Sequence, residues 1–276
     1  MDARESLERI AAEAVRGELS FPTHAEVAMR VRLALDDPEQ HLDQAVQLVQ
    51  AEPLLAARVV AVANSVAYNR SGRTIADVKN AVARLGFQLV RALASAVVMR
   101  QMMAGAVQGP FRVHAERLWE HTAHVAALCH VLARRLTRRD PDIAFFTGLV
   151  HEVGGFYLIS RAAEYPGILE RGVDPSWEQG GERQVGGAVL RSLAVPGTVL
   201  AAIESFWSGE WAEAPETLAG TLGLAHRLTP ISSPLQVAAN AASMPESGVP
   251  DIDADLAAFL LESAEELDSL TAALKF

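Results

Sequence analysis

Residues 143–155 read Ile-Ala-Phe-Phe-Thr-Gly-Leu-Val-His-Glu-Val-Gly-Gly. At about 100° per residue, the apolar side chains of this stretch surround a helix almost completely, so we expect the helix to lie inside the protein. His151 and Glu152 close it. A buried carboxylate needs a cation, a hydrogen-bond donor or a metal, because burial alone would raise its pKa until it protonates. The pair therefore marks a candidate metal or acid–base site.

The rest of the chain also has helical periodicity. Ala, Leu, Arg, Glu and Gln dominate almost every segment, and alternating β-branched residues are nearly absent. Thr23 and Glu26 predict a capping box, Pro53 predicts a helix start, and Gly86 predicts a left-handed helix end. We predict an all-α fold with helices over residues 3–18, 23–35, 40–51, 53–64, 74–85, 87–103, 113–138, 143–152, 156–163, 176–194, 196–207, 215–228 and 251–274.

One short stretch between apolar helices is the best candidate for a domain boundary. Residues 105–110 hold two glycines and a proline. We therefore predict two helical subdomains, residues 1–105 and 110–230, followed by a helical tail over 231–276. Because the connection is short, the two subdomains are expected to pack together.

Composition excludes several classes of function. Half of the 276 residues are hydrophobic, which is enough for a sizeable core. The net charge of −10 predicts no binding of nucleic acid or of an anionic membrane surface. Cys129 is the one cysteine and is expected in the core, which excludes an internal disulfide. No apolar run is judged to approach the ~18 residues of a membrane span, and no signal peptide is recognised, so a cytoplasmic protein is expected.

Two further histidines are candidates to join His151 and Glu152. His121 lies at the edge of the apolar stripe of the 113–138 helix, and His226 points inward from a later helix. A single inward histidine is usually a hydrogen-bonded core residue. Together the four residues offer three imidazoles and a carboxylate, a complete donor set for one divalent transition metal. Spacing along the helices does not show whether they converge. The remaining histidines at caps or on polar faces are assigned to the surface: His24, His41, His114 and His130.

Several motifs in order resemble the HDOD domain, a degenerate relative of the HD-type metal-dependent phosphohydrolases found in bacterial signalling proteins. The resemblance spans about residues 15–230. It is carried by Phe21-Pro22, Glu52-Pro53-Leu54-Leu55-Ala56-Ala57-Arg58, Asn64-Ser65-Val66-Ala67-Tyr68, Thr74-Ile75, Asn80-Ala81-Val82-Ala83-Arg84-Leu85-Gly86, Leu118-Trp119-Glu120-His121 and Gly148-Leu149-Val150-His151-Glu152-Val153-Gly154-Gly155. It implies a multi-helical, HD-domain-like fold and a regulatory role.

The chain departs from the hydrolytic pattern that this resemblance implies. His151-Glu152 stands for the paired His-Asp, and Gly155 replaces the lysine that often follows. Glu182 occupies the place of a histidine ligand. Phe206-Trp207 replaces a later His-His pair, and His226 replaces the terminal Asp ligand. The ligands of a second metal and that lysine would stabilise the negative charge that develops during phosphoryl transfer. This chain has neither.

We therefore expect a non-catalytic signalling module that acts by protein–protein interaction. No catalytic residue and no metal are expected. His121, His151, Glu152 and His226 would form a vestigial pocket, although a single divalent metal there is left open. The alternatives are a single-metal phosphohydrolase and a nucleotide sensor without turnover. The partners are expected to be signalling proteins of unknown identity, and a homodimer is left open.

Trp207 and Trp211 flank a glycine-containing loop and are the candidate partner-binding residues, because exposed tryptophan is enriched in binding hot spots. The alternative is that both fold back as lids over the former metal pocket.

Overall fold

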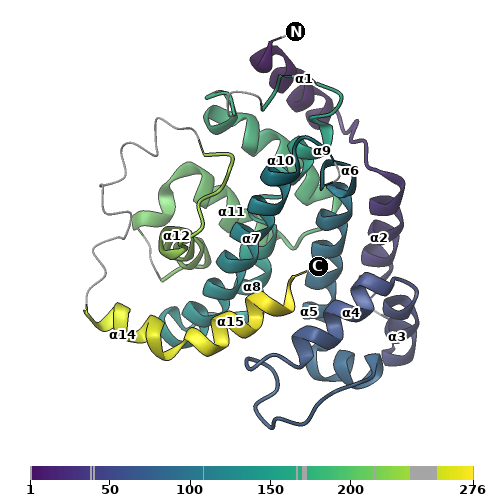
Figure 1. The fold of residues 1–276 in the computed structure, drawn as a ribbon, viewed down its shortest axis with the longest axis vertical. Helices are drawn as coiled ribbons and strands as arrows, with labels where there is room; N and C mark the ends of the chain where they lie inside the picture. The colour runs from purple at the N-terminus through teal and green to yellow at the C-terminus, as the bar shows by residue number, and fades with distance from the viewer. Residues whose placement is uncertain are drawn as a thin grey trace.

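The computed structural model describes residues 2–37, 39, 41–107, 109–165, 167–169, 173–213, 216–236 and 254–275. These residues form helices and connecting loops without a strand, which confirms the all-α prediction. Figure 1 shows the helices gathered around α7, α8 and α5, with the yellow C-terminal helices lying across one side.

The first half of the chain contains α1 (Ala3–Val15), α2 (Thr23–Ala34), α3 (Leu42–Gln50), α4 (Pro53–Ala63) and α5 (Val78–Met102). Pro53 starts α4 as predicted, and the Glu52 side chain accepts a hydrogen bond from the Leu55 amide. Gly86 bends α5 at a positive φ of 76°, a conformation that glycine adopts without strain. The predicted Thr23 cap is wrong: Pro22 occupies the cap position, and no side-chain hydrogen bond is made there.

The second half contains α6 (Ala104–Val107), α7 (Arg112–Leu132), α8 (Pro141–Val150), α9 (Val153–Arg161), α10 (Glu182–Ser192), α11 (Gly197–Ser208) and α12 (Leu218–Leu228). Short π-helical or 3-10 turns accompany them: η1 (Ala133–Thr137), η2 (Trp177–Gly181) and η3 (Glu210–Glu213). The predicted 113–138 helix thus changes to a π-helical turn after Leu132, and it stops at Arg138, whose φ is 53°. α8 is buried from Ala144 to Val150, as expected.

α5 connects the two halves of the fold. It packs on α2, α3 and α4 on one side and on α8 and α9 on the other. The side chain of Arg32 on α2 is buried and reaches Ser95 on α5 and the carbonyl oxygen of Ala194. The two halves therefore share one core, although the domain boundaries stay a prediction.

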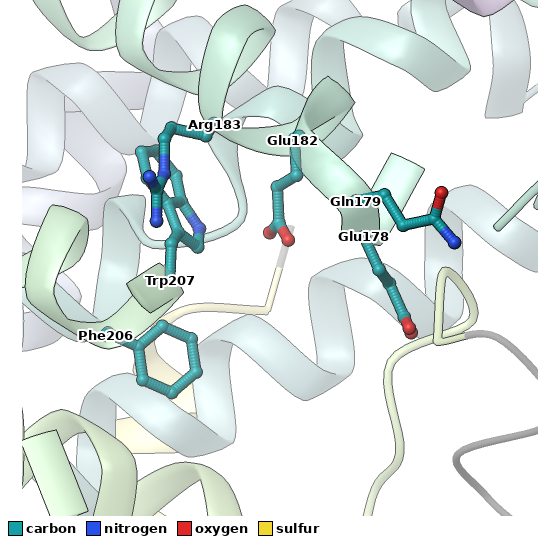
Figure 2. Close-up of a pocket in the computed structure, with 7 residues that line it drawn as sticks. Glu178, Gln179, Glu182, Arg183, Phe206 and Trp207 are labelled. Carbon is teal, nitrogen blue, oxygen red and sulfur yellow. The ribbon is translucent and has the colours of Figure 1, made fainter. Parts of the chain in front are cut away.

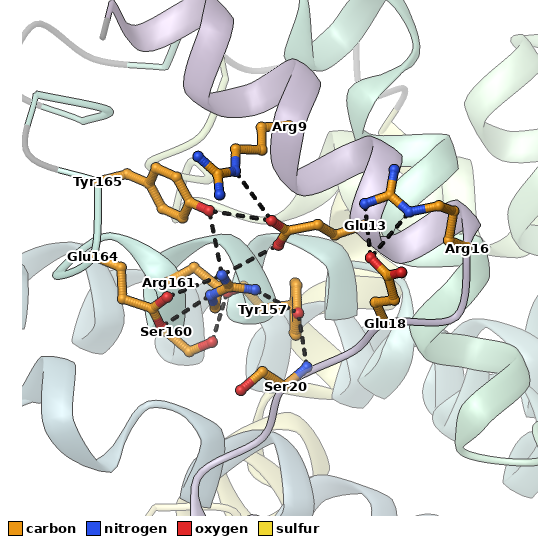
Figure 3. Close-up of polar contacts among 10 residues, drawn as sticks. All are labelled: Arg9, Glu13, Arg16, Glu18, Ser20, Tyr157, Ser160, Arg161, Glu164 and Tyr165. Carbon is orange, nitrogen blue, oxygen red and sulfur yellow. Dashed lines mark hydrogen bonds and ion pairs between the residues drawn. The ribbon is translucent and has the colours of Figure 1, made fainter.

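A polar cluster attaches the N-terminal helix (Figure 3). The buried guanidinium of Arg161 on α9 donates to Tyr157 Oη, to Glu164 and to Glu13 of α1. Its carbon also lies 5.8 Å and 5.5 Å from the ring centroids of Tyr157 and Tyr165. The paired cation and its aromatic neighbours thus connect α1 to α9, and the rings offset part of the cost of burying the charge.

The C-terminal helices α14 (Ala254–Glu262) and α15 (Ala264–Ala273) are separated at Ser263, where one continuous helix was predicted. Glu266 of α15 pairs with Arg134 at 2.7 Å and with Arg135 at 3.3 Å. His130 Nε2 lies 3.5 Å from the same carboxylate, and the His130 side chain is only 3% exposed. Its assignment to the surface is therefore wrong, because α15 covers that face of α7.

Two helical segments, Val78–Met102 and Pro141–Arg161, have the length and mean hydropathy of a membrane span, 1.5 and 1.4 respectively. The bent pair of helices Leu42–Gln50 and Pro53–Ala63, taken together, also has the length and hydropathy of a membrane span. The sequence-based judgement that no apolar run approaches this length is therefore wrong. In the fold, 67% and 89% of the two apolar windows are buried.

Candidate metal centre

Four secondary-structure elements bring the predicted donor set together. His121 comes from the middle of α7, His151 caps the end of α8, Glu152 precedes α9, and His226 lies in the last turn of α12. Each offers one ligand atom, and these atoms lie within 4.8 Å of one another. The convergence that the sequence left open is thus present in the fold.

Backbone carbonyl groups orient two of the imidazoles. His121 Nδ1 lies 2.6 Å from the Ile231 carbonyl oxygen, and His151 Nδ1 lies 2.7 Å from that of Gly148. A carbonyl oxygen only accepts, so each Nδ1 carries the proton and each Nε2 keeps its lone pair. Both Nε2 atoms are buried without a hydrogen-bond partner. They lie 3.5 Å and 4.0 Å from Glu152 Oε1. Metal-binding histidines have this arrangement, with the second nitrogen donating to a fixed acceptor.

Glu152 has a hydrogen-bond donor that the sequence did not suggest. The hydroxyl of Ser233 donates to Glu152 Oε2 at 2.9 Å, and both residues are buried. The sequence predicts only that a cation, a hydrogen-bond donor or a metal meets this carboxylate. Ser233 follows α12 in a loop, and no local pattern relates it to Glu152. This contact could only be found in the folded structure.

Burial keeps the centre close to electrical neutrality. It lowers the pKa of His121 to about 4 and that of His226 to about 3. Burial, together with the neighbouring His121 and His226, also holds the pKa of His151 well below its usual value. Burial raises the pKa of Glu152 to about 7, while the Ser233 hydrogen bond acts in the opposite direction. At neutral pH the imidazoles are therefore neutral, the form that binds a metal.

Aromatic side chains close one side of the centre. The Phe206 ring centroid lies 5.2 Å from that of His226 and 6.1 Å from that of His151. Trp211 lies 6.3 Å from Phe206 and packs against the backbone of Gly223, leaving no room for a Cβ there. Trp207 packs on Gly186 in the same way. Trp207 and Trp211 are half-buried in this arrangement, so each ring is partly packed and partly exposed.

A cavity of about 500 Å³ shares Phe206 with this centre (Figure 2). Glu178 and Glu182 face it from one side, and Phe206 and Trp207 face it from the other. Burial and the charge of Glu152 raise the pKa of Glu182 to about 8. Among the residues that line the cavity, Arg183 is the one cation, so its walls carry little positive charge for an anionic ligand.

Comparison with known proteins agrees with this architecture. The model of the HDOD domain matches residues 21–175. The chain belongs to the HDOD domain family. The family match runs across the predicted subdomain boundary and covers His121, His151 and Glu152, whereas His226 and Ser233 lie beyond it. No curated protein gives a significant match.

Solved structures show the same fold over nearly the whole chain. A protein from Shewanella amazonensis, provisionally described as a metal-dependent phosphohydrolase, is 23% identical, with a TM-score of 0.66 and 99% of each chain covered. An HDOD domain protein of unknown function from Geobacter sulfurreducens is 20% identical, with a TM-score of 0.61 and coverage of 98% and 97%. A protein from Marinobacter aquaeolei, provisionally described as a signal transduction protein, is 21% identical, with a TM-score of 0.58; 99% of this chain and 66% of that chain are covered. The HDOD resemblance of the sequence is thus confirmed.

Proposed function

We propose that this HDOD protein is a cytoplasmic signalling module that holds one divalent transition-metal ion and acts by binding other proteins, without hydrolysing phosphate esters. The observation that carries the proposal is the convergence of four donor groups with the unpartnered Nε2 atoms of His121 and His151 among them. Three neutral imidazoles and a carboxylate suit Zn²⁺, Mn²⁺ or Fe²⁺. Unpaired polar atoms in a buried site are costly, and an ion would satisfy them.

The donor residues come from four segments, so a bound ion would link α7, α8, the start of α9 and α12. When bound, such an ion supplies a Lewis acid and positive charge. The protein contributes the orientation: His121 and His151 are fixed by carbonyl groups, and Glu152 is fixed by a hydroxyl. A folded scaffold whose rigidity depends on an ion is well suited to regulation.

Two packing features argue against phosphate-ester hydrolysis. Gly155, where the resemblance implies a lysine, supplies no cation, and the Leu235 side chain occupies the space beside it. Phe206, at a position where the resemblance implies a metal ligand, packs on His151 and His226 instead. Catalysis of phosphoryl transfer needs cations around the reacting phosphate. The donor set alone favours a second candidate, a single-metal phosphohydrolase.

Elemental analysis of protein purified without chelator tests the proposal. We expect close to one equivalent of transition metal, and stabilisation against heat when metal is added to chelator-treated protein. At free metal a hundredfold above Kd, the gain is about 2.7 kcal/mol, or about 5–10 °C in Tm. No metal-dependent product should form from cyclic dinucleotides or phosphomonoesters. Absence of bound metal would refute metal binding, and turnover that His151→Ala abolishes would establish the hydrolase instead.

The partner surface is proposed to include Trp211, which lies beside Phe206 and is half-buried. Trp211→Ala should leave the fold intact while abolishing retention of a signalling partner from the cell extract in pull-downs. Glu210→Ala, an exposed neighbour in η3, is the matched control. If Trp211→Ala also unfolds the protein, as circular dichroism would show, Trp211 acts as a lid and the partner surface lies elsewhere.

A further inference from the structure

The loop that follows α12 contacts the metal-centre residues of two other helices. This segment, Thr229–Leu235, is called the strap below. Thr229 has an extended conformation, and the proline after it disfavours a further helical turn, so the strap leaves α12 three residues after His226. The Ile231 carbonyl oxygen accepts from His121 on α7, and the Ser233 hydroxyl donates to Glu152 at the start of α9.

Several contacts hold the strap beside the residues of the metal centre. Arg117 Nε donates to the Ser232 carbonyl oxygen at 3.3 Å, and Thr229 Oγ1 lies 3.3 Å from His124 Nδ1. The Leu235 side chain is 3% exposed and fills the space over Gly155. A Cβ on Gly155 would lie 2.4 Å from the Leu235 Cδ1, so the glycine leaves space for this buried side chain.

The hydrogen bonds of Ser233 assign different roles to the two oxygens of Glu152. Ser233 Oγ accepts from the Leu235 amide at 3.3 Å, so its single proton is directed to Glu152 Oε2. Oε1 is left facing the Nε2 atoms of His121 and His151. The glutamate side chain has one more rotatable bond than that of aspartate. The hydrogen bond from Ser233 restricts rotation about this extra bond.

We infer that Ser233 is a positioning residue for divalent-metal binding: it holds Glu152 so that Oε1 stays directed at the imidazole nitrogens. The inference rests on the proposed metal function and adds a residue from outside the donor set. Loss of a hydrogen bond that orients a metal ligand typically weakens metal affinity by about 10–100-fold. Ser233→Ala should show a loss in this range, and Ser233→Thr, which keeps the hydroxyl, should recover most of it.

Isothermal titration of the full-length, chelator-treated protein with Zn²⁺ and with Mn²⁺ tests this role. Ser232→Ala is the matched control, because Ser232 is exposed and uses only its backbone carbonyl oxygen. Glu152→Asp shortens the carboxylate so that Ser233 no longer reaches it. If Ser233 acts through Glu152, Ser233→Ala should cost little further affinity in the Glu152→Asp background, whereas an independent effect would add in full.

The possible outcomes distinguish failure of the proposed metal function from failure of the role inferred for Ser233. If the unsubstituted protein takes up no metal, the metal function and this inference fall together. If it binds metal and Ser233→Ala binds equally well, only the inference is overturned. Should Ser233→Ala fail to fold by circular dichroism, the near-isosteric pair Ser233→Thr and Ser233→Val decides, because only threonine retains the hydroxyl. A Ser233→Thr affinity near that of the unsubstituted protein, with a loss in Ser233→Val, supports the positioning role; equal affinities of the two variants overturn it.

Discussion

Replacing His151 with alanine is expected to abolish stoichiometric metal binding. His151 is 1% exposed, its Nδ1 is fixed by the Gly148 carbonyl oxygen, and its Nε2 lies unpartnered beside Glu152. The substitution removes one of four donors and leaves a void that the surrounding helices only partly fill. Because loss of an orienting partner alone costs about 10–100-fold, loss of the ligand itself should cost at least about a hundredfold in affinity. Titration with Zn²⁺, followed by elemental analysis after dialysis, measures this loss.

His124→Ala is the control for removal of an imidazole from this region. His124 is half-buried on α7 and contacts Thr229, but it lies outside the donor set. Its loss should leave one equivalent of metal bound. Retention of full stoichiometry and affinity by His151→Ala would show that the four donors do not act as one centre.

Replacing Gly148 with alanine is expected to destabilise the protein strongly. A Cβ at this position would lie 2.8 Å from the Ala126 Cα and 2.9 Å from the Cys129 Sγ, where α8 crosses α7. Backbone atoms cannot give way as a flexible side chain can, so the two helices must separate. Overpacking of this kind costs about 1–3 kcal/mol, or several degrees of Tm in a chain of this size. Differential scanning calorimetry of the metal-free protein measures the effect, and Gly148→Val should lower Tm further.

A second consequence concerns the metal centre, since α7 carries His121 and α8 ends at His151. Separation of these helices should also weaken metal binding. Gly105→Ala is the matched control: Gly105 lies in the short helix α6, and a Cβ there meets no atom within 4 Å. Its Tm should be unchanged or slightly higher, because alanine is the better helix former. Equal melting temperatures for Gly148→Ala and the unsubstituted protein would mean that α7 and α8 are not in contact through Gly148.

Local signals in the sequence were sufficient for the fold class and for the inward direction of the candidate donors. Pro53 and Gly86 act on the backbone at their own positions, so their effects can be predicted without the fold. Apolar side chains surround the helix over residues 143–150 almost completely, so its burial could likewise be predicted from the sequence. His121 and His226 were predicted to point inward because side-chain direction along a helix follows from its periodicity.

Predictions failed where a distant segment decides the outcome. His130 lies on a face of α7 that is polar in sequence, but α15 covers that face through Glu266. The judgement that no apolar run approaches the length of a membrane span was wrong because α8 and α9 together form a long apolar segment. This segment packs against other helices of the fold. The partner-binding role of Trp207 and Trp211 remains a prediction.

The sequence by itself determined that the chain is all-helical, that it resembles the HDOD family, and that three histidines and a glutamate are available on inward-facing positions. Only the tertiary structure decided that these four donors converge, since the distance between helices depends on packing rather than on periodicity. It also decided which oxygen of Glu152 faces the imidazoles. That choice depends on the hydrogen bond from Ser233, a residue 81 positions away in the sequence.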